Sequence, residues 1–98
     1  MNNIPKEKLE KILNLFHLLR NENRFKILFL LMEKEMNVSE LQEEIGGTQS
    51  AISHQLAELR KVNLVKDRQE KRMRYYSIYD EHVIEIIQSA ISHIDEDC

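Results

Sequence analysis

The chain has 98 residues and a net charge of −3, and 32% of its residues are charged. This length fits one domain with a single core of marginal stability. No apolar run approaches the roughly 18 residues of a membrane helix, and the one cysteine, Cys98, excludes a disulfide framework. We therefore expect a single, mostly helical domain over residues 1–98, located in the cytoplasm and without a membrane partner.

The charge is distributed unevenly along the chain. Residues 60–74 contain seven Lys or Arg against two acids, a net charge of +5, which leaves −8 for the rest. A basic stripe on an acidic body allows a polyanion to bind at one surface. By charge alone, a solvated surface hairpin is an equally good interpretation.

The first part of the chain predicts two helices. Apolar residues from Leu9 to Leu19 follow the helical period, and Leu15 and Leu18 extend the apolar surface to a second side of the helix. A helix that is apolar on two sides usually has two partners, so we assign the second side to a dimer interface. Residues 25–32 are apolar except for Lys26, and this second helix should form the centre of the core.

Residues 38–62 predict a helix-turn-helix. Asn37 can cap a short helix at 38–45, Gly46 and Gly47 permit a sharp turn, and Thr48 can cap a fourth helix at about 49–62. The polar side of the fourth helix is short enough to approach a DNA groove, where Gln and Ser can contact bases. This side contains Gln49, Ser50, Ser53, His54, Ala57 and Lys61.

After Asn63 the apolar period changes to about two, which predicts strands at 64–68 and 73–78, joined near 69–72. A basic hairpin after a helix-turn-helix is the pattern of a winged helix. The fourth helix, which is the second helix of the helix-turn-helix, would enter the major groove, and the hairpin would lie along phosphates or the adjacent minor groove. The predicted fold is mainly α with a small β-hairpin, in the order of four helices, hairpin and fifth helix, and it forms a homodimer through the first and last helices.

The last helix, residues 80–96, carries two of the four histidines. His82 and His93 are about 20° apart around the helix but about 16 Å apart along it. His93 and Glu96 share one face at i and i+3, and Asp80 lies at the N-cap beside His82. The helix therefore carries two half-sites, each with one imidazole and one carboxylate.

One metal ion cannot join these half-sites, because bonds from zinc to its ligands are about 2 Å long. An antiparallel second copy would bring Asp80 and His82 of one chain to His93 and Glu96 of the other, giving two identical interfacial sites per dimer. Four such protein ligands suit a structural or sensing site for zinc, with cobalt as the usual substitute. The alternative is that these residues form an ordinary solvated helix face. Glu85 lies on the same face, as expected for a solvated polar stripe.

Residues 15–96 resemble the ArsR/SmtB family of metal-sensing repressors. The stretch 19–28 (LRNENRFKIL) resembles the family's second-helix signature, residues 48–56 (TQSAISHQL) its recognition helix, and residues 64–78 its wing. The spacing of Asp80, His82, His93 and Glu96 is similar to the last-helix site of the family's zinc and cobalt sensors.

This resemblance implies a mechanism. A metal-free dimer would bind double-stranded operator DNA and block transcription of metal-efflux or metal-handling genes. Zinc at the two interfacial sites would lower the affinity for DNA, with His93 acting through the backbone carbonyl of Asn63. The residues expected to contact DNA are Gln49, Ser50, Ser53, His54, Lys61, Lys66, Arg68, Lys71, Arg72 and Arg74.

The chain also departs from the family pattern. Asn37 and Ser39 stand where some members have a Cys-x-Cys pair, which disfavours a thiolate site. Residues 70–71 replace a glycine that is frequent in the wing turn, and Lys disfavours a positive φ there. Glu96 stands where some relatives have His, so cobalt and nickel stay open beside zinc. Cys98 is either an auxiliary ligand or, more simply, a tail thiol.

Three other functions are alternatives to a metal-sensing repressor. A dimeric winged-helix regulator without metal sensing, or with another effector, would bind no zinc tightly. A small zinc hydrolase is disfavoured, because protein fills all four ligand positions and no nucleophile–base pair is apparent. A protein-interaction module would show no salt-dependent DNA binding. We therefore expect a DNA-binding regulator and not an enzyme.

Overall fold

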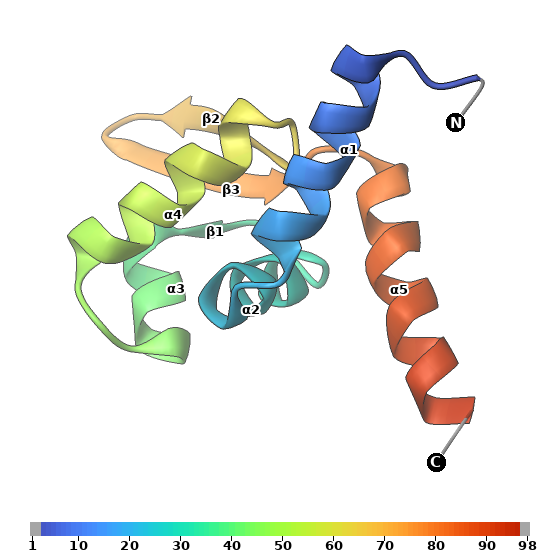
Figure 1. Cartoon of the computed structure of the whole chain (residues 1–98). Helices are drawn as coiled ribbons and strands as arrows, with labels where there is room; N and C mark the ends of the chain where they lie inside the picture. The colour runs from blue at the N-terminus through green and yellow to red at the C-terminus, as the bar shows by residue number, and fades with distance from the viewer. Residues whose placement is uncertain (1–2, 97–98) are drawn as a thin grey trace.

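The computed structural model describes residues 3–96, and its elements follow the order of a winged helix-turn-helix (Figure 1). Four helices precede the hairpin, and a fifth helix follows it. The elements are α1 (Lys6–Leu19), α2 (Glu22–Leu31), β1 (Met36–Asn37), α3 (Val38–Ile45), α4 (Gln49–Lys61), β2 (Val65–Glu70), β3 (Met73–Ile78) and α5 (Glu81–Glu96).

Side-chain caps fix where three of the helices begin, and two of these caps, Asn37 and Thr48, are the residues that the sequence predicted. At α2, Asn21 Oδ1 accepts a 3.0 Å hydrogen bond from the backbone N–H of Arg24. At α3, Asn37 and Glu40 exchange side chain–backbone hydrogen bonds of 2.9 and 3.0 Å in a capping box. Thr48 caps α4 through a bond of 3.1 Å. Each cap satisfies a backbone donor that has no partner inside its helix.

The second helix lies at the centre of the core, as expected from its apolar sequence. It contacts α1, α3, α4 and β3, and its Ile27 and Leu28 are fully buried. Each such side chain contributes about 1.5–3 kcal/mol of hydrophobic free energy on burial. The other buried apolar residues are Leu18, Leu31, Met36, Leu41, Ile52, Leu56, Leu59, Leu64, Val65, Ile78, Val83 and Ile87.

The predicted hairpin is part of a three-stranded antiparallel sheet with the order β1-β3-β2. Strands β2 and β3 pair from Val65↔Ile78 to Glu70↔Met73, so the turn is shorter than the predicted 69–72. The sequence does not predict β1, because a two-residue strand is too short to show a period. Since Asn37 of β1 also caps α3, this strand joins the wing directly to the helix-turn-helix.

The two terminal helices leave apolar side chains uncovered. In α5, Val83 and Ile87 are buried against the body, whereas Ile94 is 60% exposed near the end that projects away from it (Figure 1). In α1, Leu13 and Phe16 are each 58% exposed. Among the helices of residues 3–96, none combines the length and hydropathy needed to cross a membrane.

Candidate functional site

The fourth helix presents the predicted polar surface. Its buried side consists of Ile52, Leu56 and Leu59, and each of the six residues on its predicted polar side is exposed. The turn before it requires glycine, because Gly46 and Gly47 have φ values of 90° and 80°. Two side-chain hydrogen bonds hold this turn, from Gln42 Nε2 to the Gly47 carbonyl (2.8 Å) and from Gln49 Nε2 to Ser39 Oγ (3.1 Å). The polar side of α4 therefore starts from a fixed position.

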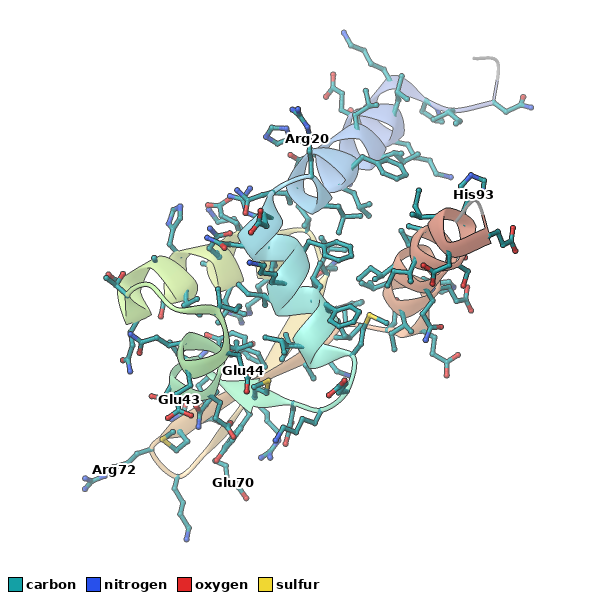
Figure 2. All side chains as sticks on the ribbon, turned by 90° about the horizontal axis from the view of Figure 1, so that it is seen from below. Arg20, Glu43, Glu44, Glu70, Arg72 and His93 are labelled. Carbon is teal, nitrogen blue, oxygen red and sulfur yellow. The ribbon has the colours of Figure 1, made fainter. Side chains whose placement is uncertain are left out.

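The wing divides its cations into two groups. Lys66, Lys71 and Arg72 are exposed and form no ion pair with the described residues, and Arg72 extends from the hairpin tip (Figure 2). Arg68 and Arg74 are instead paired with acids of the same protomer. The first group is free to contact phosphate, whereas the second must exchange an existing partner for it.

Arg68 connects the wing to the segment before β1. Its Nε donates to both carboxylate oxygens of Glu35 (3.1 and 3.0 Å), its Nη1 pairs with Glu70 at 3.2 Å, and its guanidinium lies 4.9 Å from the centroid of the Tyr75 ring. The hydrogen bonds that Arg68 donates to Glu35 and Glu70 raise the pKa of Arg68, and the bonds that Glu35 accepts from Arg68 lower the pKa of Glu35. Arg68 therefore has a clear positioning role inside the protomer.

Asp67 makes a second connection, between the recognition helix and the wing. Its side chain is only 10% exposed, its Oδ1 lies 2.9 Å from Arg60 Nε in the last turn of α4, and its Oδ2 pairs with Arg74 of β3. The sequence alone predicts no role for Asp67 or Glu35. Asp67 lies inside the basic segment 60–74, but Glu35 lies outside it and is 33 positions from Arg68, and apolar periodicity identifies neither acid.

The first of the two predicted half-sites lies at the start of α5. Asp80 Oδ1 accepts hydrogen bonds from the backbone N–H groups of His82 (3.0 Å) and Val83 (3.3 Å), and Oδ2 lies 3.4 Å from His82 Nδ1. Partial desolvation raises the pKa of Asp80, but the hydrogen bonds from His82 and Val83 outweigh it and hold that pKa below its usual value. The cap thus orients an ionised carboxylate next to an imidazole that is 85% exposed.

The second half-site lies at the other end of α5. His93 and Glu96 are exposed, and Figure 2 shows His93 at the end of the helix, far from the hairpin tip marked by Arg72. Within residues 3–96, no three potential ligands from His, Cys, Asp and Glu gather at one place. Each half-site has the nitrogen and oxygen donors that zinc accepts, but only two of the four that a closed site needs. Cys98 lies outside the described residues.

Asn63 follows the recognition helix in a left-handed conformation, with φ of 59°. Its backbone N–H bonds to the Arg60 carbonyl at 3.1 Å, and the Leu64 N–H bonds to the Leu59 carbonyl at 3.0 Å. These bonds end α4 and start the chain toward β2. Asn adopts the left-handed conformation at a lower steric cost than most other residues, which explains why an asparagine occurs at this position.

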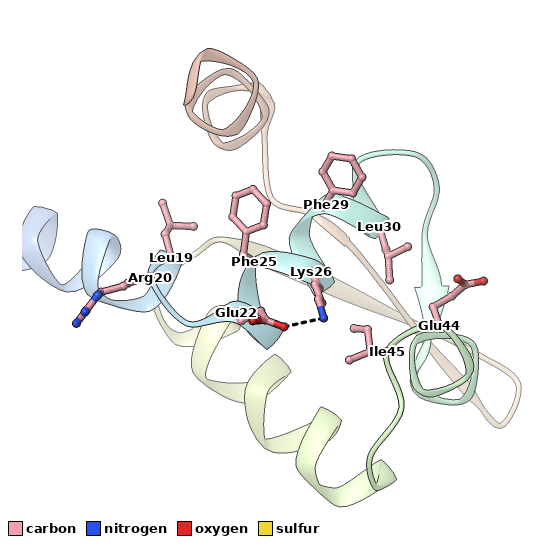
Figure 3. Close-up of a pocket in the computed structure, with 9 residues that line it drawn as sticks. All are labelled: Leu19, Arg20, Glu22, Phe25, Lys26, Phe29, Leu30, Glu44 and Ile45. Atoms are coloured by element: carbon pink, nitrogen blue, oxygen red, sulfur yellow. Dashed lines mark ion pairs between the residues drawn. The ribbon is translucent and has the colours of Figure 1, made fainter. Parts of the chain in front are cut away.

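An apolar surface continues from α5 onto α2. Phe25 lines a hollow with Ala90, Ile91 and Ile94 of α5, and it also lines a larger hollow of about 550 Å³ on α2. Figure 3 shows Phe25 and Phe29 side by side at the larger hollow, with ring centroids 6.4 Å apart. The uncovered surface of α5 is therefore contiguous with that of α2.

Comparison with known proteins places this geometry in a family. Residues 21–67, from the cap of α2 to β2, match the model of the bacterial regulatory proteins of the arsR family. The chain is 31% identical over 90 residues to a transcriptional repressor SmtB homolog from Synechocystis sp., covering 92% of this chain and 68% of that protein. It is 30% identical over 91 residues to a cadmium resistance regulatory protein CadC homolog from Staphylococcus aureus, covering 92% and 75%.

Two further similarities bear on function. The transcriptional activator HlyU from Vibrio cholerae is 35% identical over 78 residues, which cover 80% of this chain and 72% of that protein. A solved homodimeric winged helix-turn-helix DNA-binding domain of a possible ArsR-family regulator from Mycobacterium bovis superposes with a TM-score of 0.87 at 27% identity, covering 99% of this chain and 93% of that one. The chain therefore belongs to the ArsR family of bacterial transcriptional regulators.

Proposed function

We propose that the protein is a metal-responsive repressor, whose dimer binds operator DNA and loses affinity for it when zinc or cobalt binds between its last helices. The observation that carries this proposal is the pair of incomplete two-donor sites at opposite ends of α5, a helix whose apolar surface is also uncovered. Family membership makes the protein a transcriptional regulator and excludes the hydrolase interpretation.

The DNA contact follows from α4 and the wing. Gln49, Ser50, Ser53 and His54 occupy the exposed start of α4 and would read base edges in the major groove. Lys61 and the wing residues Lys66, Lys71 and Arg72 would contact phosphates. Arg68 and Arg74 belong to the proposed contact set, but their pairs with Glu35 and Asp67 make positioning their first role.

The dimer is proposed to form through α1 and α5. Leu13, Phe16 and Ile94 are large, apolar and more than half exposed, which is costly for a free protomer in water. The solved relative from Mycobacterium bovis is itself homodimeric. A two-fold axis that places two α5 helices antiparallel would cover these residues and complete both half-sites at once.

The four ligands would come from both protomers: Asp80 and His82 of one, with the partner's His93 and the partner's Glu96. A bound zinc ion supplies bonds that join the two α5 helices. Asp80 is already ionised and held by the helix start, so this half-site needs little rearrangement. His93 would pass the change to the end of the recognition helix by donating its second N–H to the backbone carbonyl of Asn63. The relatives named SmtB homolog and cadmium resistance protein support a metal input.

Metal and DNA must then oppose each other to the same extent. If the metal-bound arrangement of the dimer binds DNA more weakly by some factor, DNA binding weakens the metal by that factor. The second candidate is a dimeric regulator without metal input, or one with another effector. It is favoured by the similarity to HlyU, whose name describes an activator and no metal.

Fluorescence anisotropy with duplex DNA from upstream of the protein's own gene separates the two candidates. We expect about one zinc ion per protomer to weaken binding, and His93→Ala to remove this effect. Ser89→Ala, on the same side of α5, serves as the matched control and should keep it. Equal DNA affinity with and without zinc would leave the regulator without metal input as the better account.

A further inference from the structure

A pocket of about 340 Å³ lies where α1 ends and α2 begins, and none of its lining residues belongs to the proposed DNA or metal sites. Its lining residues are His17, Arg20, Asn21 and Arg24. Two of the four are arginines, one is a histidine, and none is an acid. In a chain with a net charge of −3, such a gathering of cationic groups without a carboxylate is unexpected.

The two arginines have no ionic partner in the described part of the chain. Arg60, Arg68 and Arg74 each pair with an acid, whereas neither Arg20 nor Arg24 does. Arg24 is partly buried, and its Nε is fully buried without a hydrogen-bond acceptor. A buried donor on a charged group is costly to leave unpaired, and no acceptor among the described residues offsets the burial of this part of the Arg24 guanidinium.

The backbone at this pocket also favours an anion. Asn21 satisfies two donors of α2, since its Oδ1 accepts from the Arg24 N–H at 3.0 Å and its carbonyl accepts from the Phe25 N–H at 2.9 Å. The first amides of the ten-residue helix α2 have no partner within the helix, and such amides favour an anion. Glu22, the acid in this first turn, does not line the pocket and is paired with Lys26 at 2.8 Å.

We propose that this pocket binds a phosphate group, held by the guanidinium groups of Arg20 and Arg24 with His17 at its edge. Guanidinium groups suit this ligand because their parallel N–H donors match two phosphate oxygens. Arg20 is exposed to solvent, where a ligand can reach it, and it also lines the edge of the apolar hollow of α2 (Figure 3). The phosphate comes either from the backbone of bound DNA, which rests on the proposed function, or from a small phosphate-bearing molecule, which does not.

The first experiment tests the pocket without DNA. Inorganic phosphate replaces chloride at constant ionic strength, and the Nε–H resonance of Arg24 is followed by two-dimensional NMR of the full chain. We expect a shift that saturates, that is lost in Arg20→Gln, and that persists in Lys34→Gln, a matched change at an exposed lysine outside the pocket. A shift that does not saturate, or that is the same in Arg20→Gln, would overturn the proposal.

The second experiment identifies the source of the phosphate. The slope of log K for DNA against log salt should become shallower by about 0.9 for each phosphate contact that Arg20→Gln removes, and should stay unchanged in Lys34→Gln. A saturating phosphate shift together with an unchanged slope supports the pocket and assigns it to a small phosphate-bearing molecule. If the protein binds no DNA, the proposed function fails, but the phosphate titration still decides whether the pocket exists.

Discussion

Asp67 and Arg60 form an ion pair with 2.9 Å between Oδ1 and Nε, and this pair joins strand β2 to the last turn of the recognition helix. The same carboxylate holds Arg74 of β3 through its other oxygen. One almost buried side chain therefore sets the position of the wing relative to α4, although both elements are otherwise polar and exposed. The relative position of the residues proposed to read bases and those proposed to contact phosphates depends on it.

Replacing Asp67 with Asn should lower the free energy of unfolding by about 1–2 kcal/mol. The carboxylate is nearly buried and its loss leaves two guanidinium groups without their partner, although both arginines are half exposed and are partly solvated. Urea denaturation measures this change. Glu58→Gln, which removes the surface pair between Glu58 and Lys61, is the control and should cost less than about 0.5 kcal/mol. Equal effects of the two variants would contradict the positioning role of Asp67.

The wing turn contains a lysine in a left-handed conformation, since Lys71 has φ of 56°. Lys71→Gly should raise the free energy of unfolding by about 0.5–1 kcal/mol, because glycine removes the steric cost of the positive φ but adds backbone entropy to the unfolded chain. Arg72→Gly is the matched control, because it also removes one wing cation but φ is not positive there. It should lower the free energy of unfolding. If urea denaturation shows that both variants change the free energy of unfolding in the same direction, the backbone at Lys71 is not strained.

Glu35 should make stability depend on pH on the acid side. Its pKa in the folded protein lies below the ordinary value of 4.5, because Arg68 donates hydrogen bonds to the ionised carboxylate. The resulting stabilisation is complete above the ordinary pKa and is lost as the pH falls through the lower, folded value. In Glu35→Gln, the fall in unfolding free energy below about pH 4.5 should be shallower than in the parent. Glu33→Gln, at a nearby exposed acid, should keep the slope of the parent.

Ile94→Glu should weaken the dimer without unfolding the protomer. The side chain is already 60% exposed in the protomer, so a charge there costs little until the partner covers it. Sedimentation velocity should show a shift from dimer toward monomer. Met73→Glu provides the comparison, because Met73 is also apolar and exposed but lies in the wing. A dimer that tolerates Ile94→Glu as well as Met73→Glu would show that α5 is not in the interface.

The sequence predicted those parts of the fold that depend on local chemistry. Asn37 and Thr48 are capping residues at fixed offsets from their helices, and the alternation after Asn63 marks a change from helix to strand. The same kind of signal placed Asp80 at the start of α5, beside His82. These features follow from a few neighbouring residues and therefore appear in the sequence itself.

The missed features depend on contacts between distant segments. Strand β1 exists because Met36 and Asn37 pair with Tyr76 and Tyr75, and two residues alone show no strand pattern. Arg68 was assigned to DNA from its charge, but its pair with Glu35 spans 33 positions of the chain. Only the folded chain shows which cations of the wing are paired with acids and which are not.

A mixed dimer tests most directly whether the metal site is shared between protomers. One chain carries Asp80→Ala and His82→Ala, and the other carries His93→Ala and Glu96→Ala. Each homodimer then lacks half of both sites, whereas the mixed dimer keeps one complete site, formed by Asp80 and His82 of one chain with the partner's His93 and the partner's Glu96. Zinc titration of the purified mixed dimer should give about one tightly bound ion per dimer, and the homodimers should bind none tightly. If the mixed dimer binds zinc no better than the homodimers, the two α5 helices do not share a metal site and the account is wrong.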